Sequence, residues 1–327
     1  MAHKKSAMTI LFLVSAFLLI SSYSYSAEYA NPQLLVTPEY VEKNAGKIVL
    51  LDCRDEKDYA AGHIPGAINL GGACGKVLRD TSLRVKKTED LEKMFSKAGV
   101  GMDKPVVVYA DAKLITSATV AFWVLEYLGH DKVFFLNGGI DEWLDSNKKT
   151  EEAAAKLPAA TFKAKVIKNR IATTAEMVQI AKGETKNATV IDSRTEKEHA
   201  GTDIRAVRGG HIPNTIINVS HIKTYDVQTG MIHPRDDLEK LFSSLDKNKR
   251  TIAYCQTGTR STLTYLELRL LGFKEPVNYD DSWIIDGSNM DCPVANENWY
   301  DFVKVNEALK AIGGLKKAVE ELKTNKQ

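Results

Sequence analysis

The sequence predicts an α/β protein of two tandem domains, each with a central, mostly parallel sheet flanked by helices. Three observations lead to this fold class: a long internal repeat, short apolar strand-like runs that alternate with helical patterns, and a weakly patterned linker between the copies. A chain of 327 residues is long enough to give each domain its own hydrophobic core.

The repeat starts with a strand-like run that ends in aspartate. "IVLLDCRDEKDYAAGHIPGAIN" at 48–69 returns as "TVIDSRTEKEHAGTDIRAVRGGHIPNTIIN" at 189–218. The offset is 140 residues between Asp52 and Asp192 and 148 between the two "GHIP" motifs, so the second copy carries an eight-residue insertion. A repeat of this length indicates duplicated domains rather than a solenoid.

Each copy alternates strands and helices. In the first copy, "IVLLD", "VVVYA" and "KVFFL" are typical of buried strands, and 117–128 is typical of a helix. In the second, the strand that ends at Tyr254 is followed by a helical pattern that stops at Gly272. We assign 28–150 to the first domain, 151–168 to a charged, alanine-rich linker and 169–300 to the second domain.

The two ends of the chain carry separate signals. Residues 1–27 resemble a secretory signal peptide, because Lys4 and Lys5 precede an apolar run of about 12 residues, too short to span a bilayer. We therefore expect an exported, periplasmic or extracellular protein that is free of the membrane after cleavage; an uncleaved anchor is the alternative. At 301–327 we expect an amphipathic helix docked on the body, interrupted at Gly313-Gly314, with a partner-binding helix as the alternative.

Charge and cysteine content exclude several classes of protein. The 44 Lys and Arg face 42 Asp and Glu, and removal of Lys4 and Lys5 leaves 42 against 42. No basic stripe predicts binding to nucleic acid. The four cysteines form no CxxC, so neither a disulfide scaffold nor a zinc site is indicated. Cys53 fits a core position, whereas Cys74 and Cys292 are inert or paired with each other.

Cys255 is the candidate nucleophile. It lies where a strand gives way to a helix, in "YCQTGTRS". The amide groups of Gln256, Thr257, Gly258 and Thr259 can curl around the sulfur, and the helix dipole and Arg260 favour an anion at the centre of that loop. The thiol pKa should therefore fall below its usual value, which makes Cys255 a thiolate nucleophile.

Over about 33–298 the chain resembles the tandem-domain rhodaneses, the thiosulfate and 3-mercaptopyruvate sulfurtransferases. The motifs that carry the resemblance are "LLDCRDEKDYAAGHIPGAINL", "VFFLNGGIDEW", "VIDSR", "GGHIP", "YCQTGTRS" and "YDDSW". The resemblance implies two rhodanese-like domains and transfer of a sulfane sulfur from a small donor, through a cysteine persulfide, to a thiol or cyanide or to a protein acceptor. It implies no metal or organic cofactor.

The resemblance also implies roles for single residues. Cys255 matches the persulfide-forming cysteine, and 256–260 match the cradle around it. Arg194 matches an arginine that contacts the donor's anionic end, although a structural role is an equal alternative, because Arg54 repeats it in the first copy. Arg205 and Arg208, in the insertion, are weaker candidates: they could also reach the cleft expected between the two domains.

Three departures limit the resemblance. Ala110 stands at the cysteine position of the first copy, so we expect that domain to be non-catalytic. The pair Gln256-Thr257 matches neither the basic pair of thiosulfate enzymes nor the small neutral pair of mercaptopyruvate enzymes. Asp281 stands where the family usually has glycine, which puts the local turn in doubt.

The histidine of the "GHIP" motif occurs in both copies, as His63 and His211, so a structural hydrogen bond explains these residues better than catalysis.

Two other functions remain as alternatives. A Cys-x(n)-Arg loop also holds oxyanions in phosphatases and arsenate reductases, but those relatives use a loop one residue longer. A sulfur carrier or interaction module with little turnover alone would use the first domain and the C-terminal helix as docking surfaces. The donor, the acceptor and the oligomeric state stay open.

Overall fold

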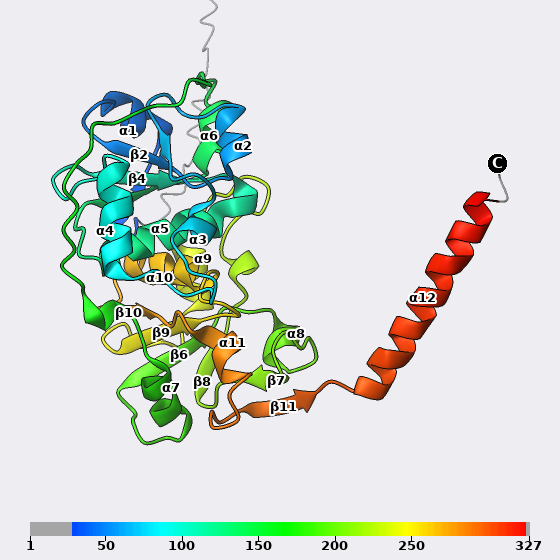
Figure 1. The fold of residues 1–327 in the computed structure, drawn as a ribbon. Coiled ribbons are helices and arrows are strands. Elements are labelled where there is room, and N and C mark those ends of the chain that lie inside the picture. Colours follow the sequence, from blue (N-terminus) through cyan, green and yellow to red (C-terminus); the bar gives the residue numbers. More distant parts are fainter. Residues whose placement is uncertain (1–27, 325–327) are drawn as a thin grey trace, which may run out of the picture.

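The computed structural model describes residues 28–324, which form two α/β domains and a projecting C-terminal helix (Figure 1). The proposed signal segment, 1–27, lies outside the described residues. Within 28–324 no helix is both long and apolar enough to cross a bilayer.

The first domain is a five-stranded parallel sheet covered on both faces. Its strand order is β1 (Leu35–Val36), β5 (Val133–Leu136), β4 (Val106–Tyr109), β2 (Val49–Asp52) and β3 (Ile68–Asn69). One face packs against α1 (Pro38–Lys43), α2 (Glu56–Ala60) and α6 (Gly139–Asp145). The other face packs against α3 (Cys74–Val77), α4 (Thr88–Lys97) and α5 (Ile115–Tyr127). The expected strands and helix of this copy are confirmed.

The second domain repeats the plan with four parallel strands. Their order is β10 (Glu275–Asn278), β9 (Arg250–Tyr254), β6 (Ala188–Asp192) and β8 (Thr215–Asn218). Around them lie α7 (Thr174–Ala181), α8 (Glu196–His199), α9 (Arg235–Leu241), α10 (Ser261–Leu270) and α11 (Ser282–Asp286). A separate antiparallel pair, β7 (Arg208–His211) with β11 (Ala295–Trp299), uses the insertion of the second copy.

The domains meet through α5 and α10, which lie side by side at the centre of the molecule (Figure 1). Helix α5 is apolar on almost every side because its own sheet covers one face and α10 the other. The Thr119 and Thr262 hydroxyls bond across the contact at 2.8 Å. One continuous hydrophobic cluster therefore includes residues of both domains, and the domains are held as a single packed unit.

The cysteine pairing differs from the expectation. Cys53, at the end of β2, forms a disulfide with Cys74, the first residue of α3, and both are fully buried. Cys292 is a free thiol, so the suggested pairing of Cys74 with Cys292 is wrong. The first residue of α3 and the end of β2 meet because β3 brings the chain back beside β2.

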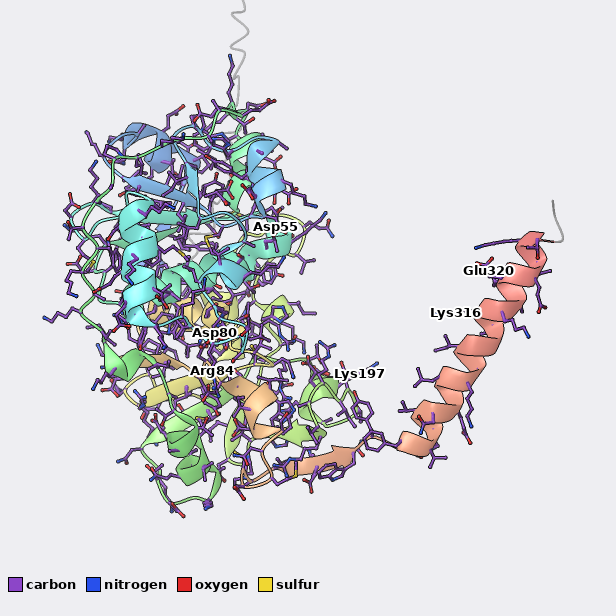
Figure 2. The ribbon with its side chains drawn as sticks, viewed as in Figure 1. Asp55, Asp80, Arg84, Lys197, Lys316 and Glu320 are labelled. Carbon is purple, nitrogen blue, oxygen red and sulfur yellow. A yellow bond between two sulfur atoms is a disulfide. The ribbon has the colours of Figure 1, made fainter. Side chains whose placement is uncertain are left out.

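The C-terminal helix also differs from the expectation. Helix α12 (Phe302–Thr324) runs without interruption and leaves the body after β11, with all its side chains exposed (Figure 1). The prediction of a docked helix broken at Gly313-Gly314 is wrong: glycine weakens a helix by ~1 kcal/mol but does not forbid helical angles. Lys316 and Glu320 lie on this projecting arm in Figure 2.

Candidate active site

Cys255 follows β9 directly, at the carboxyl edge of the sheet, between β10 and β6. Residues 255–260 form a compact loop before α10 begins at Ser261. Gly258 adopts φ +72°, and a Cβ there would lie 2.6 Å from the Asp280 carbonyl oxygen, so only glycine fits. The loop thus has the expected form, and Cys255 itself is fully buried.

The carbonyl groups of this loop are all held from outside it. Cys255 O accepts from Trp283 N–H at 3.0 Å, and Gln256 O from Ile284 N–H at 2.8 Å, both at the start of α11. Thr257 O and Gly258 O accept from the Arg79 guanidinium of the first domain, at 2.6 and 2.9 Å. Because N–H and C=O of a planar trans peptide point in opposite directions, these contacts turn the following amides inward.

The inward groups favour a thiolate. Burial alone would raise the pKa of Cys255, but Arg260, the amides of Ser261 and Thr257 and the Ser261 hydroxyl outweigh it and lower the pKa below the usual value. The Ser261 Oγ–Cys255 Sγ distance is 3.6 Å. The other free thiol is the opposite case: burial and then Asp286 raise the pKa of Cys292 to about 11.

Arg260 is anchored by a residue that the sequence analysis missed. Its two terminal nitrogens donate to the Glu198 carboxylate at 2.7 and 2.8 Å. Burial opposes ionisation of Glu198, but these contacts overcome it and lower its pKa to about 2. Glu198 also closes a capping box with Thr195 at the start of α8. "TEKE" in the sequence signalled that box, whereas nothing local signalled the arginine.

Arg194 is buried in a structural pair. Its guanidinium binds both Asp192 oxygens and the Gly210 carbonyl, and it stacks on the Trp283 ring at 4.5 Å. Arg54 makes the same contacts with Asp52 and Gly62 in the domain without a thiol. The geometry therefore favours the structural alternative for Arg194 over contact with a donor.

The insertion arginines have separate roles. Arg208 is buried and donates to the carbonyls of Asp286, Asn289 and Cys292, so its guanidinium is taken up by structural contacts. Arg205 is half-exposed, lies 3.8 Å from Glu198, and its carbonyl accepts from the Gln256 side chain at 2.7 Å. Arg205 alone of these two lies at the rim of the site.

The "GHIP" histidines support the turns that follow the second helix of each copy. The His63 ring stacks on Tyr59 and donates to its carbonyl. The His211 ring stacks on His199 and donates to its carbonyl in the same way. A third histidine, His221, was not singled out; burial, then Arg260, lowers its pKa to about 4, so it is neutral beside the site.

The turn at "YDDSW" tolerates Asp281 because the strain falls on the next residue. Asp281 has φ −62°, which any residue adopts, whereas Ser282 has φ +52°. The Ser282 hydroxyl accepts from Cys255 N–H at 3.1 Å and donates to the Tyr279 carbonyl at 2.6 Å. In the first domain Gly139 takes the corresponding place, against the Ala110 carbonyl.

The first domain has no equivalent of the cradle. Ala110 is followed by a short 3-10 turn, Ala112–Leu114, that runs directly into α5, and its carbonyl accepts from Ile140 N–H. Without a sulfur at this position the domain cannot carry a persulfide. The fold and the site thus define an α/β protein with one activated thiol, surrounded by amides, on the second of two similar domains.

Comparison with known proteins gives the family. The model of the rhodanese-like domain matches residues 37–146 and 174–284. The thiosulfate sulfurtransferase of Corynebacterium glutamicum is 32% identical over 295 residues, 85% of this chain and 96% of that protein. A putative thiosulfate sulfurtransferase of Haloferax volcanii is 30% identical over 84% of this chain and 99% of that protein.

Solved structures show the same fold. The 3-mercaptopyruvate sulfotransferase SseA from Escherichia coli aligns with a TM-score of 0.66 and 24% identity, over 77% of this chain and 99% of that one. An anaerobic ergothioneine biosynthesis enzyme from Chlorobium limicola aligns with a TM-score of 0.72 and 18% identity, over 81% of this chain and 71% of that one. The chain belongs to the rhodanese family and is a sulfurtransferase with two rhodanese-like domains.

Proposed function

We propose that the protein is a thiosulfate sulfurtransferase that works through a persulfide on Cys255. The observation that carries the proposal is the six-residue loop in which inward amides and Arg260 surround the Cys255 sulfur. The names of the relatives that share about 30% of its sequence support thiosulfate as the donor. The six-residue loop also argues against the phosphatase and arsenate reductase alternative.

The reaction balances without a further reagent. The Cys255 thiolate attacks the outer sulfur of thiosulfate; a new S–S bond forms, the old one breaks, and sulfite leaves with the electron pair. Cyanide or a thiolate then attacks the terminal sulfur of the persulfide and restores the Cys255 thiolate. The inward amides stabilise negative charge on the cysteine sulfur before the first step and after the second.

In this scheme Arg260 does not bind the donor with both terminal nitrogens of its guanidinium. Glu198 occupies both terminal nitrogens, so Arg260 acts on Cys255 mainly as a fixed positive charge. Gln256, Thr257 and Thr259 offer neutral polar groups at the mouth of the loop, and Arg205 adds a charge at the rim. In this proposal these groups receive the donor, and Arg194 has no contact with it.

The test of this function is an intact mass measurement. The purified protein is incubated with thiosulfate, and separately with 3-mercaptopyruvate, beside the Cys255→Ala variant. A gain of one sulfur with thiosulfate, absent in the variant, is expected. A gain only with 3-mercaptopyruvate would replace the donor, and no gain with either, in folded protein, would overturn the persulfide mechanism.

Export is a second part of the proposal. The leader at 1–27 motivates it, and the buried Cys53–Cys74 disulfide supports it, because such bonds persist in oxidising compartments. Fractionation of cells that express the full chain, with N-terminal sequencing, tests it. A cytosolic protein that keeps Met1 would overturn export and leave the chemistry untouched.

The sulfur-carrier function has one observation in its favour. Large apolar side chains of α12 are exposed because no other part of the described chain covers them. They are Phe302, Val305, Leu309, Ile312, Leu315, Val319 and Leu322. A carrier would load sulfur at Cys255 but pass it slowly to cyanide and faster to a protein thiol. Steady-state turnover with cyanide decides between the two functions.

A further inference from the structure

We propose that Arg79, on the domain without a thiol, is a positioning residue that aims the amides of Gly258 and Thr259 at the Cys255 sulfur. This inference rests on the proposed function and adds to it a specific task for the first domain. It concerns a side chain that the sequence analysis did not single out and that does not touch the reacting atoms.

Both terminal nitrogens of Arg79 are engaged, whereas its Nε has no hydrogen-bond partner among residues 28–324. Its Nη1 donates to Thr257 O at 2.6 Å, and its Nη2 donates to Gly258 O at 2.9 Å. Nη2 also lies 2.6 Å from the Asp280 carboxylate, and Nη1 donates to Leu83 O at 2.5 Å. The side chain is 2% exposed, so these donors have no water to bind instead.

These two carbonyls fix two amides. Because the peptide is planar and trans, the Thr257 carbonyl and the Gly258 N–H point in opposite directions, as do the Gly258 carbonyl and the Thr259 N–H. A guanidinium that holds both carbonyls outside the loop therefore turns both N–H groups toward its centre. Two such groups on a thiolate or a persulfide supply electrostatic stabilisation that needs no reorganisation during the reaction.

The segment that Arg79 holds is the part of the loop whose own sequence restricts its backbone angles least. Glycine adopts left- and right-handed backbone angles at similar cost, and Gly258 joins the two peptides in question. The earlier carbonyls, of Cys255 and Gln256, are held by α11 of their own domain. Among residues 28–324, the first domain holds this loop only at the carbonyls of Thr257 and Gly258. Within the loop's own domain, Asn278 of β10 adds one contact to the Gly258 carbonyl at 3.1 Å.

Arg79 is itself held in place. It lies in a tight turn closed by a β-bridge to Val85, and Val85 N–H donates to Asp280 at 2.7 Å. The Cys53–Cys74 disulfide ties the start of α3 to β2, five residues before Arg79. A long, flexible side chain is thereby presented to the loop from a rigid base, as a positioning role requires.

A through-space effect of charge must be separated from this role. The titratable or charged groups of residues 28–324 around the site are Arg260 in the loop, Glu198 of α8, Arg205 at the rim, His221 before α9, Asp280 after β10 and Arg79. Arg79 would favour a Cys255 thiolate by its charge alone. Lysine keeps that charge but has a single nitrogen on a flexible stem, which does not bridge two carbonyls as a fork does.

The experiment compares Arg79→Lys and Arg79→Gln with the matched control Arg84→Gln. Arg84 lies at the same domain boundary in Figure 2 and forms an ion pair with Asp281, but it does not touch the loop. Three quantities are measured: kcat and KM for thiosulfate with cyanide, the pH profile of iodoacetamide alkylation at Cys255 mapped by peptide mass, and thermal unfolding.

The positioning role predicts that both Arg79 variants lose at least about tenfold in kcat, since one preorganised donor is commonly worth ~10²-fold. It also predicts a higher midpoint of the alkylation profile, with a smaller change in KM and with Arg84→Gln within about twofold of wild type. If kcat and the alkylation midpoint of Arg79→Lys equal those of wild type, Arg79 acts by its charge alone. If both variants equal wild type, Arg79 has no role in positioning the loop. Either result overturns the proposal.

Two points keep the result interpretable. If Arg79→Gln unfolds, Arg79→Lys retains the ion pair with Asp280 and carries the test, with rates normalised to the alkylatable Cys255 fraction. If the wild-type protein gains no sulfur from either donor, the proposed function fails, yet the alkylation profiles still report whether Arg79 organises the loop. The two failures are therefore distinguishable.

Discussion

Glu198 holds both terminal nitrogens of Arg260 while the same arginine provides the main positive charge on Cys255. The carboxylate thus fixes where the charge lies and also reduces its strength at the sulfur. Glu198→Gln removes the negative charge, so the Cys255 pKa should fall further. Arg260 should also lose its fixed position, so kcat/KM should fall about tenfold or more. Alkylation profiles and steady-state rates measure both effects.

Glu196→Gln is the matched control for that variant. Glu196 lies on the same short helix but pairs with Lys223 at the surface. Its loss should leave both profiles unchanged. Wild-type alkylation profiles and rates in Glu198→Gln would contradict the assigned geometry.

The same pair should shape stability in acid. Burial of Glu198 opposes its ionisation, but the hydrogen bonds and charge of Arg260 outweigh burial and lower its pKa to about 2, from an ordinary value of 4.5. Its contribution is therefore complete above about pH 4.5 and is lost as the pH falls toward 2. Between those limits the free energy of unfolding should fall more steeply in wild type than in Glu198→Gln. Equal slopes in urea titrations would refute this linkage.

Glu267 should act in the opposite direction. It lies on α10 with no exposed surface and with no hydrogen-bond partner among residues 28–324, because the nearby Thr224 hydroxyl donates to His221 O. Burial raises its pKa from 4.5 to about 8. The unfolded chain ionises first as the pH rises, so this group destabilises the fold progressively between pH 4.5 and 8.

Glu267→Gln should therefore stabilise the protein at pH 8, with little difference from wild type at pH 4. Urea unfolding at both pH values measures the change. The exposed Glu275→Gln serves as control, since it lies in water and should change neither value by more than about 0.5 kcal/mol. A variant that is less stable than wild type at pH 8 would show that the carboxyl is satisfied in solution.

Ser282 combines backbone strain with two useful hydrogen bonds. Its φ of +52° costs ~1 kcal/mol for a residue with a side chain, and its hydroxyl links Cys255 N–H to the Tyr279 carbonyl. Ser282→Ala keeps the strain and loses the contacts, so it should destabilise the fold by ~1–2 kcal/mol. Ser282→Gly loses the same contacts but relieves the strain, so it should be the more stable of the two by urea unfolding. The reverse order would contradict the backbone angle.

The disulfide gives a thiol count. Denatured but unreduced protein that lacks the leader should show two reactive thiols, from Cys255 and Cys292, and four after reduction. The double variant Cys53→Ala/Cys74→Ala should lose ~3 kcal/mol of stability, because the bond closes a loop over a sequence separation of 21. Cys292→Ala is the control that removes a thiol without a bond. Four reactive thiols before reduction would exclude the disulfide.

The sequence predicted the features that depend on local pattern. Apolar runs that end at Asp52 and Tyr254 became β2 and β9, and a glycine two residues before Arg260 marked the loop around Cys255. These features are local because strand burial and loop angles are encoded within a few residues. The repeat then supplied the arrangement of the two domains.

The features that the sequence did not predict depend on distant contacts. Arg79 and Thr257 are 178 residues apart, and Arg260 and Glu198 are 62 apart, so no periodicity relates them. The Cys53–Cys74 bond depends on the return of β3 beside β2. The path of α12 depends on where β11 ends, which no amphipathic pattern reports.

The dependence of the loop on Arg79 bears on how a duplicated gene can change. Ala110 leaves the first copy without a reactive sulfur, so a substitution at that position acts on the packing of its own core and not on sulfur chemistry. Position 79 belongs to the same copy, yet a substitution there would be felt 178 residues away in the other. The two halves can therefore no longer diverge, or be separated, as independent genes.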